Sequence, residues 1–257
     1  MEETKDGFVK VERENGISTI EFYHPHSNSL PRKILDALTK AIITEGTNPT
    51  IKVLVLRSLG EKIFCSGASF DELAAITTEE GGLNFFCGFA NVINAMRTCG
   101  KIIIARIQGK CIGGGVGLAA AADYAIACEG ADVKLSELAV GIGPFVIGPA
   151  VERKIGSSAF SQLAIDAVTF RPGDWARRKG LFAELHPDIA GMDESIIRLS
   201  NTLANSNPNA LKELKKIFWN GTEHWNDLLN ERAAISGKLI LSEYSQAFIN
   251  KFKHKLS

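Results

Sequence analysis

Two short segments of the sequence are costly to the fold unless they serve a chemical purpose. Residues 64–68 read Phe-Cys-Ser-Gly-Ala, where Gly67 permits a turn with positive φ and leaves the amide of Ala68 free to face a ligand. Residues 113–115 are three consecutive glycines that open an apolar helix. Consecutive glycines lose much conformational entropy on folding, so we expect them where the backbone approaches another group closely. A helix N-terminus there would add free N–H donors and the positive end of the helix dipole.

A third segment, residues 135–144, is apolar except for Ser136 and one carboxylate, Glu137. Burial without a charged partner raises the pKa of a carboxyl group, which makes Glu137 a candidate to take up and return a proton. The alternative is a structural carboxylate, because buried charges are usually paired. The glycine run could likewise reflect tight packing alone. It does not match a dinucleotide fingerprint, which fails at Leu118, and no Gly-Lys-Ser/Thr phosphate loop follows it.

The elements that must position these segments alternate between strands and helices up to about Ser157. This alternation predicts an α/β fold with buried parallel strands and helical crossovers. Asn15-Gly16 predicts a hairpin turn between the first two strands. Predicted strands are residues 8–13, 17–22, 53–56, 102–107 and 124–127, and predicted helices are residues 30–43, 72–76, 85–97 and 116–122. Residues 79–82, Glu-Glu-Gly-Gly, are predicted to be a loop.

Beyond Ser157 the strand signals fade and the chain is predicted to be helical. Pro208, just after Ser206-Asn207, is typical of a first helical turn. The predicted helices are residues 157–167, 173–179, 195–204, 208–219, 225–239 and 242–253.

Composition argues against several classes of protein. The 29 basic and 29 acidic side chains give no net charge, so we expect no nucleic-acid partner. No run of about 18 apolar residues occurs, so no membrane span is expected, and the charged first ten residues do not resemble a signal peptide. The five cysteines are odd in number and show no C-x-x-C spacing. This pattern favours a reduced, cytoplasmic protein without disulfides or a metal site.

Taken together and in this order, the segments resemble the crotonase superfamily, the enoyl-CoA hydratase and isomerase family, over nearly the whole chain. The resemblance rests on Phe-x-x-Gly-Ala at residues 64–68, on the Gly-Gly-Gly helix start, and on Glu137 followed by Gly141-Ile-Gly-Pro144. Asn28-Ser-Leu30 and Asp123 also resemble family positions.

The resemblance implies a crotonase-like ββα spiral with two near-perpendicular sheets and a C-terminal helical region. Residues 1–195 would form the core with an acyl-CoA site, and residues 196–257 would form a helical trimerisation region. The assembly implied is a homotrimer or a dimer of trimers.

The resemblance also implies the chemistry. The amides of Ala68 and Gly114 would form an oxyanion hole around a thioester oxygen, and Glu137 would move the proton. Coenzyme A would enter as part of the acyl-CoA substrate, with no separate cofactor and no metal. Cys65 and Ser66 would contribute backbone rather than nucleophiles, because no histidine is near them in sequence. The predicted substrate contacts are Cys65, Ser66, Phe70, Gly113, Gly115, Pro144, Phe145, Arg32, Phe248 and Lys251.

One departure from the family pattern bears on the reaction. Hydratases of the family carry a further glutamate two residues after the last glycine, where this chain has Gly117. A single carboxylate suffices to shift a double bond, so we favour enoyl-CoA isomerisation. Hydration, of a branched-chain or methylglutaconyl-CoA type, would need a replacement acid such as Asp71, Glu72 or His24. A non-catalytic acyl-CoA-binding protein is the third alternative.

Overall fold

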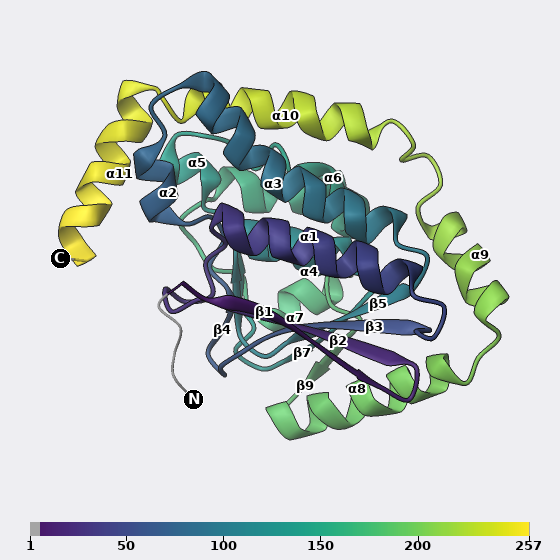
Figure 1. Cartoon of the computed structure of the whole chain (residues 1–257). Coiled ribbons are helices and arrows are strands. Elements are labelled where there is room, and N and C mark those ends of the chain that lie inside the picture. The colour runs from purple at the N-terminus through teal and green to yellow at the C-terminus, as the bar shows by residue number, and fades with distance from the viewer. Residues whose placement is uncertain (1–5, 257) are drawn as a thin grey trace.

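The computed structural model describes residues 6–256, and for residues 252–256 it describes the backbone alone. Its strands form two sheets (Figure 1). The larger sheet contains, in spatial order, β1 (Phe8–Glu14), β2 (Ile17–Tyr23), β3 (Val53–Ser58), β5 (Ile102–Ile107), β7 (Tyr124–Cys128) and β9 (Glu184–His186). The smaller sheet contains β4 (Ile63–Cys65), β6 (Lys110–Ile112) and β8 (Val133–Lys134). β1 and β2 pair antiparallel, and the other pairs are parallel.

From β3 onward, successive strands alternate between the two sheets, and helices follow each pair of strands. β3 and β4 precede α2 (Phe70–Ala75) and α3 (Glu79–Thr98), and β5 and β6 precede α4 (Gly114–Ala121). β7 and β8 precede α5 (Glu137–Val140) and α6 (Gly148–Ile165). The predicted α/β class, with two sheets and ββα units, is confirmed.

This order brings the three chemical segments together. β4, β6 and β8 are parallel neighbours in the smaller sheet, so their carboxyl ends lie at one edge. Residues 66–69, Gly113 and residues 135–136 each follow one of these strands. Ligands of α/β proteins bind at such an edge, where the loops after parallel strands converge.

Side chains of the central strands of the larger sheet point alternately to its two faces. Each face packs against a separate hydrophobic core. Leu54 and Leu56 of β3 face the main core, while Val53 and Val55 face a smaller cluster on the opposite side. Strands buried on both faces read as continuous apolar runs, as predicted for β3, β5 and β7. The smaller cluster is covered by α8 (Ile189–Ala204), which Figure 1 shows on the face opposite α1 (Arg32–Thr47) and α3.

Residues 79–82 are not the predicted loop, because α3 begins at Glu79. The side chain of Thr78 caps the helix by accepting a hydrogen bond from the amide of Gly81 (3.0 Å). Gly82 lies where α3 crosses α10 (Trp225–Leu239), and a Cβ on it would come within 2.6 Å of the Gly237 carbonyl oxygen. Of the two glycines that suggested a loop, Gly82 therefore serves a close crossing of two helices.

The region after Ser157 is helical as predicted, except for β9. It contains α7 (Gly173–Arg178), α8, α9 (Pro208–Phe218), α10 and α11 (Glu243–Leu256). The three-residue strand β9 was missed because its sequence, Glu-Leu-His, carries one apolar residue. The boundary expected after Ser195 falls inside α8, and the division into a core and a trimerisation region remains a prediction.

Asp123, which follows α4, connects β5 to α9 through hydrogen bonds of its side chain. Its carboxylate accepts hydrogen bonds from the amide of Ile103 (2.8 Å), from Lys215 Nζ (2.6 Å) and from Trp219 Nε1 (2.9 Å). The side chains of Asp123 and Lys215 are each 3% exposed, so this is a buried ion pair whose carboxylate accepts three hydrogen bonds.

Two features are not found within residues 6–256. None of the helices there is long and apolar enough to cross a membrane. Among the side chains of residues 6–251, no cluster of three or more His, Cys, Asp or Glu is arranged to hold a metal ion.

The contact between α3 and α10 gives a test of the fold. Gly82→Ala places a methyl group against the backbone of Gly237, so we expect a loss of about 1–3 kcal/mol in the free energy of unfolding. Urea denaturation measures this loss. Gly81→Ala, one residue earlier, is the control and should change the midpoint little, since its nearest contact is Thr78 Oγ1 at 3.2 Å. Equal midpoints for the two variants would contradict the crossing.

Candidate active site

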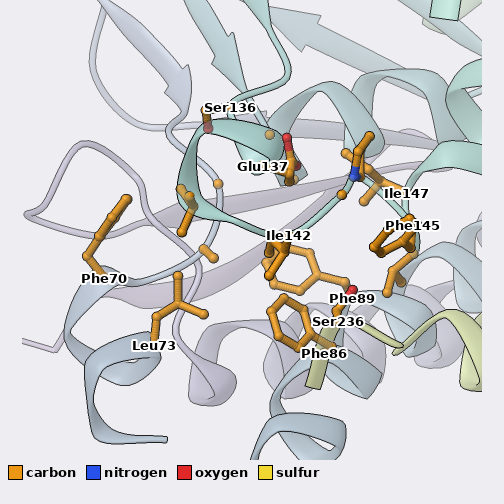
Figure 2. A pocket seen from close by; sticks show the side chains of 18 of the residues that line it. Phe70, Leu73, Phe86, Phe89, Ser136, Glu137, Ile142, Phe145, Ile147 and Ser236 are labelled. Atoms are coloured by element: carbon orange, nitrogen blue, oxygen red, sulfur yellow. The ribbon is translucent and has the colours of Figure 1, made fainter. Parts of the chain in front are cut away.

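A pocket of about 60 Å³ lies where the three segments converge (Figure 2). One side is formed by backbone of Gly67, Ala68, Gly113 and Gly114 and by the side chain of Glu137. Three serines, Ser66, Ser136 and Ser236, also line it. The remaining wall is apolar and is formed by Phe70, Leu73, Phe86, Phe89, Val140, Ile142, Gly143, Pro144, Phe145, Val146 and Ile147.

The loop after β4 is held in an unusual backbone conformation. Gly67 has φ +87°, a value that side chains rarely adopt, and its carbonyl accepts the amide of Leu30 (2.7 Å). An ideal Cβ on Gly67 would lie 3.2 Å from the Gly114 nitrogen, so this loop rests directly on the start of α4. Ser69 then caps α2 by accepting the amide of Glu72 (3.4 Å).

Asn28 fixes the chain that supports this loop. Its side-chain amide donates to the carbonyls of Leu59 (2.8 Å) and Ile63 (3.0 Å), and its Oδ1 accepts the amide of His24 (3.1 Å). Asn28 itself has φ +53°, which asparagine tolerates better than most residues. The Asn-x-Leu pattern noted in the sequence therefore holds the turn before α1 against the β3–β4 connection.

Each glycine at the start of α4 meets a different neighbour. Gly113 has φ +52°, and a Cβ on it would lie 2.9 Å from Glu137 Oε1. A Cβ on Gly114 would collide with the ring of Phe89, and one on Gly115 would collide with Cys65. The glycine run is therefore required by close packing, and Gly113 and Gly114 line the pocket.

Two backbone amides beside the pocket, those of Ala68 and Gly114, have no acceptor in the described chain. Gly114 is the first residue of α4, where N–H groups have no partner inside the helix and the dipole favours negative charge. Ala68 and Gly114 both line the pocket.

Glu137, the first residue of α5, faces this backbone across the pocket. The residue is half-buried because it faces the pocket, but Oε2 has no solvent contact and no hydrogen-bond partner in the part of the chain that the structure describes. Burial raises the pKa of Glu137 to about 7, and the nearby backbone amides of Glu137 and Ser136 offset part of this effect. A carboxyl group with such a pKa can exchange a proton near neutral pH.

The space that a glutamate side chain at position 117 would need is occupied by the apolar side chain of Ile147. A Cβ on Gly117 would lie 2.6 Å from Cγ2 and 2.8 Å from Cβ of Ile147. Ile147 also lines the pocket and is 4% exposed. No side chain larger than glycine fits at position 117 without displacing Ile147.

The three groups considered as replacement acids are engaged elsewhere. Glu72 accepts the amide of Arg32 (2.8 Å), Asp71 lies 3.3 Å from His26, and His24 contacts the Ser29 hydroxyl (2.8 Å). None of them lines the pocket. Glu137 is the one titratable side chain among the described residues that do line it.

The structure brings most predicted site residues together. Glu137, Ala68, Ser66, Phe70, Gly113, Gly114, Pro144 and Phe145 line the pocket. Cys65 and Gly115 lie behind this lining, in contact with each other. Burial raises the pKa of Cys65 to about 12, so its thiol stays protonated and does not act as a nucleophile.

Arg32, Phe248 and Lys251 do not line the pocket. Arg32 donates to Asp36 (2.8 Å) and to the side chain of Asn84 (2.7 Å), Phe248 packs against the main core, and Lys251 is exposed. Their contact with coenzyme A stays a prediction.

Three other pocket residues were not predicted from the sequence. Phe89 and Ser236 come from α3 and α10, far from the motifs in sequence. Ile147 lies in an apolar run whose orientation depends on how α6 packs against α4. The one available signal was Gly117, because a glycine inside a helix implies a neighbour that needs the space.

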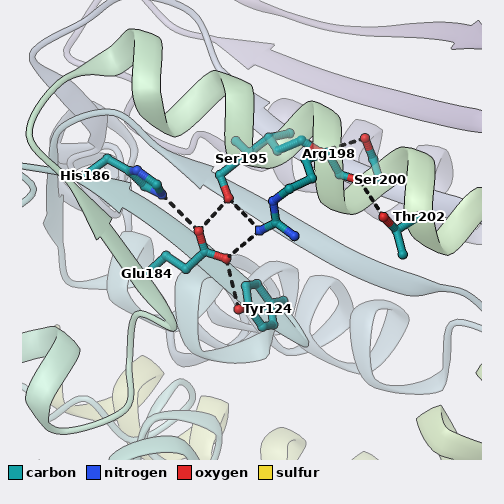
Figure 3. Close-up of polar contacts among 8 residues, drawn as sticks. Tyr124, Glu184, His186, Ser195, Arg198, Ser200 and Thr202 are labelled. Carbon is teal, nitrogen blue, oxygen red and sulfur yellow. Dashed lines mark hydrogen bonds and ion pairs between the residues drawn. The ribbon is translucent and has the colours of Figure 1, made fainter.

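A separate polar cluster contains a serine, a histidine and a glutamate but lacks the geometry of a nucleophile (Figure 3). Ser195 Oγ (2.5 Å) and His186 Nε2 (2.9 Å) both contact Glu184 Oε2, and no bond joins Ser195 to His186. Tyr124 and Arg198 bind the other oxygen, at 3.0 and 3.3 Å. The cluster joins β9 to β7 and α8, so its role is structural.

Comparison with known proteins finds one matching family model and several relatives. A family model described as enoyl-CoA hydratase/isomerase matches residues 12–252. The peroxisomal Delta(3,5)-Delta(2,4)-dienoyl-CoA isomerase of Arabidopsis thaliana is 26% identical over 213 residues, covering 77% of this chain and 75% of that protein. The carnitinyl-CoA dehydratase of Escherichia coli K12 is 26% identical over 255 residues, covering 91% and 95%.

A solved structure shows the same fold. The enoyl-CoA hydratase from Bacillus halodurans aligns with a TM-score of 0.87 at 20% identity, over 95% of this chain and 99% of that one. At this identity the likeness concerns the fold alone.

The raised pKa of Glu137 makes stability depend on pH. Relative to an ordinary value of 4.5, the folded protein holds this proton more tightly than the unfolded chain does. Stability is therefore lost as pH rises from about 4.5 through about 7. Glu137→Gln removes this loss, so we expect the variant to gain on the wild type with rising pH, by at most about 3 kcal/mol at pH 8.

Urea denaturation of both proteins at pH 5 and pH 8 measures the effect. Glu194→Gln, an exposed carboxylate on α8, is the matched control and should show no such gain. A Glu137→Gln difference that is the same at both pH values would contradict the buried, unpaired carboxylate.

Proposed function

Because this chain belongs to the enoyl-CoA hydratase/isomerase family, we propose that it is an isomerase that moves the double bond of a 3-enoyl-CoA to position 2. One observation carries the proposal: Glu137 stands alone in the pocket, with Ile147 filling the space beside Gly117 where a second carboxylate would stand. The relatives' names include both an isomerase and a dehydratase, so the names alone do not choose between these reactions.

In this proposal the thioester carbonyl lies between the amides of Ala68 and Gly114. Both amides lack a protein acceptor within the described chain and line the pocket that Glu137 faces. Removal of a proton from C2 moves negative charge onto the thioester oxygen. Donors that are already in place stabilise that charge, and one such donor is typically worth about 3 kcal/mol.

Glu137 then acts twice. Its carboxylate takes the proton from C2, and the electron pair enters the conjugated dienolate. The neutral carboxyl returns the proton to C4, and the double bond forms between C2 and C3. Both transfers occur on one face of a planar intermediate, so a single group suffices. A pKa of about 7 suits a group that must be base and then acid in one turnover.

Hydration places a different demand on the site. Water must be held and deprotonated while a proton is delivered to C2, and two carboxylates in the family's hydratases divide this work. Here the neighbouring wall at Ile147 and Gly117 is apolar and tightly packed. The absence of a second acid among the described pocket residues therefore favours isomerisation.

Several finer features belong to the proposal. Coenzyme A enters with the substrate, and no further cofactor takes part. The contacts of Arg32, Phe248 and Lys251 with it, the homotrimer or dimer of trimers, and a cytoplasmic location are predictions from the sequence that the fold leaves open to test.

A paired assay tests the reaction. The purified protein should convert a 3-enoyl-CoA to the 2-enoyl-CoA and should hydrate a 2-enoyl-CoA far more slowly. Glu137→Gln keeps the size of the side chain but cannot exchange a proton, so we expect isomerisation to fall by about 10²–10⁴-fold. Glu194→Gln should leave the rate unchanged.

Two outcomes would contradict the proposal. Efficient hydration of the 2-enoyl-CoA would mean that another group supplies the second acid. Turnover of neither substrate, with acyl-CoA still bound, would identify a binding protein that does not catalyse the reaction.

A further inference from the structure

The ring of Phe145 lines one end of the Glu137 pocket. Phe145 and Phe70 lie at opposite ends of the pocket in Figure 2. Phe145 is half-buried, and its ring folds back over its own chain, so that a Cβ on Gly143 would lie 2.5 Å from Cζ. A hydrogen bond from the amide of Phe145 to the carbonyl of Gly143 (2.7 Å) holds this tight turn. The ring is therefore braced by backbone on one side.

A second hollow lies directly behind this ring. It has a volume of about 240 Å³, four times that of the Glu137 pocket. Phe145 and Pro144 line both spaces, and Pro149, Phe160 and Ala164 are apolar parts of the far wall. A Cβ on Gly148 would lie 3.0 Å from Phe160 Cζ, so the Phe160 ring packs closely against the chain at Gly148.

The two spaces also share a wall on α10. Ser236 lines the Glu137 pocket, and Arg232, one helical turn earlier, lines the second hollow. The Ser236 hydroxyl donates to the Arg232 carbonyl (3.3 Å), so both residues lie on one face of the helix. One turn advances about 5.4 Å along the axis, a length comparable to a few carbon–carbon bonds. A chain leaving the pocket past Phe145 would thus continue along the same face.

The Glu137 pocket by itself accommodates a short chain. With a volume of about 60 Å³, the pocket has room for only a few water-sized groups. A thioester carbonyl and a few carbons fill this space. The larger space beyond would hold many more atoms but is separated from the pocket by the Phe145 ring.

We propose that Phe145 is the residue that sets acyl-chain length: its ring ends the acyl site and restricts the substrate to short-chain acyl-CoA thioesters. This inference rests on the proposed function, because it assumes that the acyl group enters the Glu137 pocket. Replacing the ring with a small side chain joins the two spaces into one channel and extends the range of chains that bind.

Binding of saturated acyl-CoA thioesters tests this without depending on turnover. Isothermal titration of butanoyl-, hexanoyl-, octanoyl- and decanoyl-CoA gives affinity as a function of chain length. For the wild type we expect affinity to fall beyond the shorter chains, so that decanoyl-CoA binds more weakly than the short thioesters. For Phe145→Ala we expect a continued rise of about fourfold per methylene through several further carbons, the factor that corresponds to about 0.8 kcal/mol.

Two further variants make the comparison specific. Phe145→Leu disturbs packing less and should give an intermediate length profile, which keeps the test available if Phe145→Ala does not fold. Phe160→Ala enlarges the second hollow without touching the Glu137 pocket, so it should retain the length profile of the wild type.

The outcomes separate the two proposals. Phe145 does not limit chain length if the wild type binds decanoyl-CoA as tightly as, or more tightly than, the short thioesters. The same conclusion follows if both Phe145 variants keep the wild-type profile. In either case the proposed function stands. If no acyl-CoA of any length binds to the wild type, the proposed function fails and this inference fails with it.

Discussion

The first turn of α4 is approached by three other parts of the chain at once, and the site depends on this crowding. The end of β4 at Cys65, the Phe89 ring of α3 and the Glu137 carboxylate of α5 each occupy the place of a missing Cβ on one of the glycines 113–115. Any other residue at these positions would push one neighbour away. The same close packing keeps the Gly114 amide at the surface of the pocket, next to the loop that carries Ala68.

This packing also accounts for the electrostatics of the site. Glu137 is surrounded by backbone and apolar side chains, so its charge receives little compensation and the pKa of its carboxyl rises to about 7. Ile147 against Gly117 extends the apolar wall where a second acid would otherwise stand. A buried carboxyl group of this kind lowers the free energy of unfolding at neutral pH. The same group can exchange a proton at that pH. The buried Asp123–Lys215 pair shows the contrasting case, a carboxylate held by three donors.

The sequence predicted the parts of the fold and site that depend on local pattern. Apolar runs located β3, β5 and β7, and the glycine motifs located the segments that converge at the carboxyl ends of β4 and β6. Features set by contacts between distant elements were missed. Gly81-Gly82 suggested a loop, although Gly82 serves the crossing with α10, and the pocket residues Phe89, Ile147 and Ser236 have no local signal. β9 owes its place to pairing with β7 and to the Glu184 cluster rather than to its own composition.

The most direct test of the central claim follows the proton that Glu137 is proposed to carry. A 3-enoyl-CoA labelled with deuterium at C2 is converted in ordinary water, and the position of the label in the product is read by mass spectrometry and NMR. A single carboxylate that serves both carbons predicts 2-enoyl-CoA in which a measurable fraction of the label has moved to C4. Product without label at C4, accompanied by accumulation of 3-hydroxyacyl-CoA, would show that solvent supplies the proton and that Glu137 does not act alone.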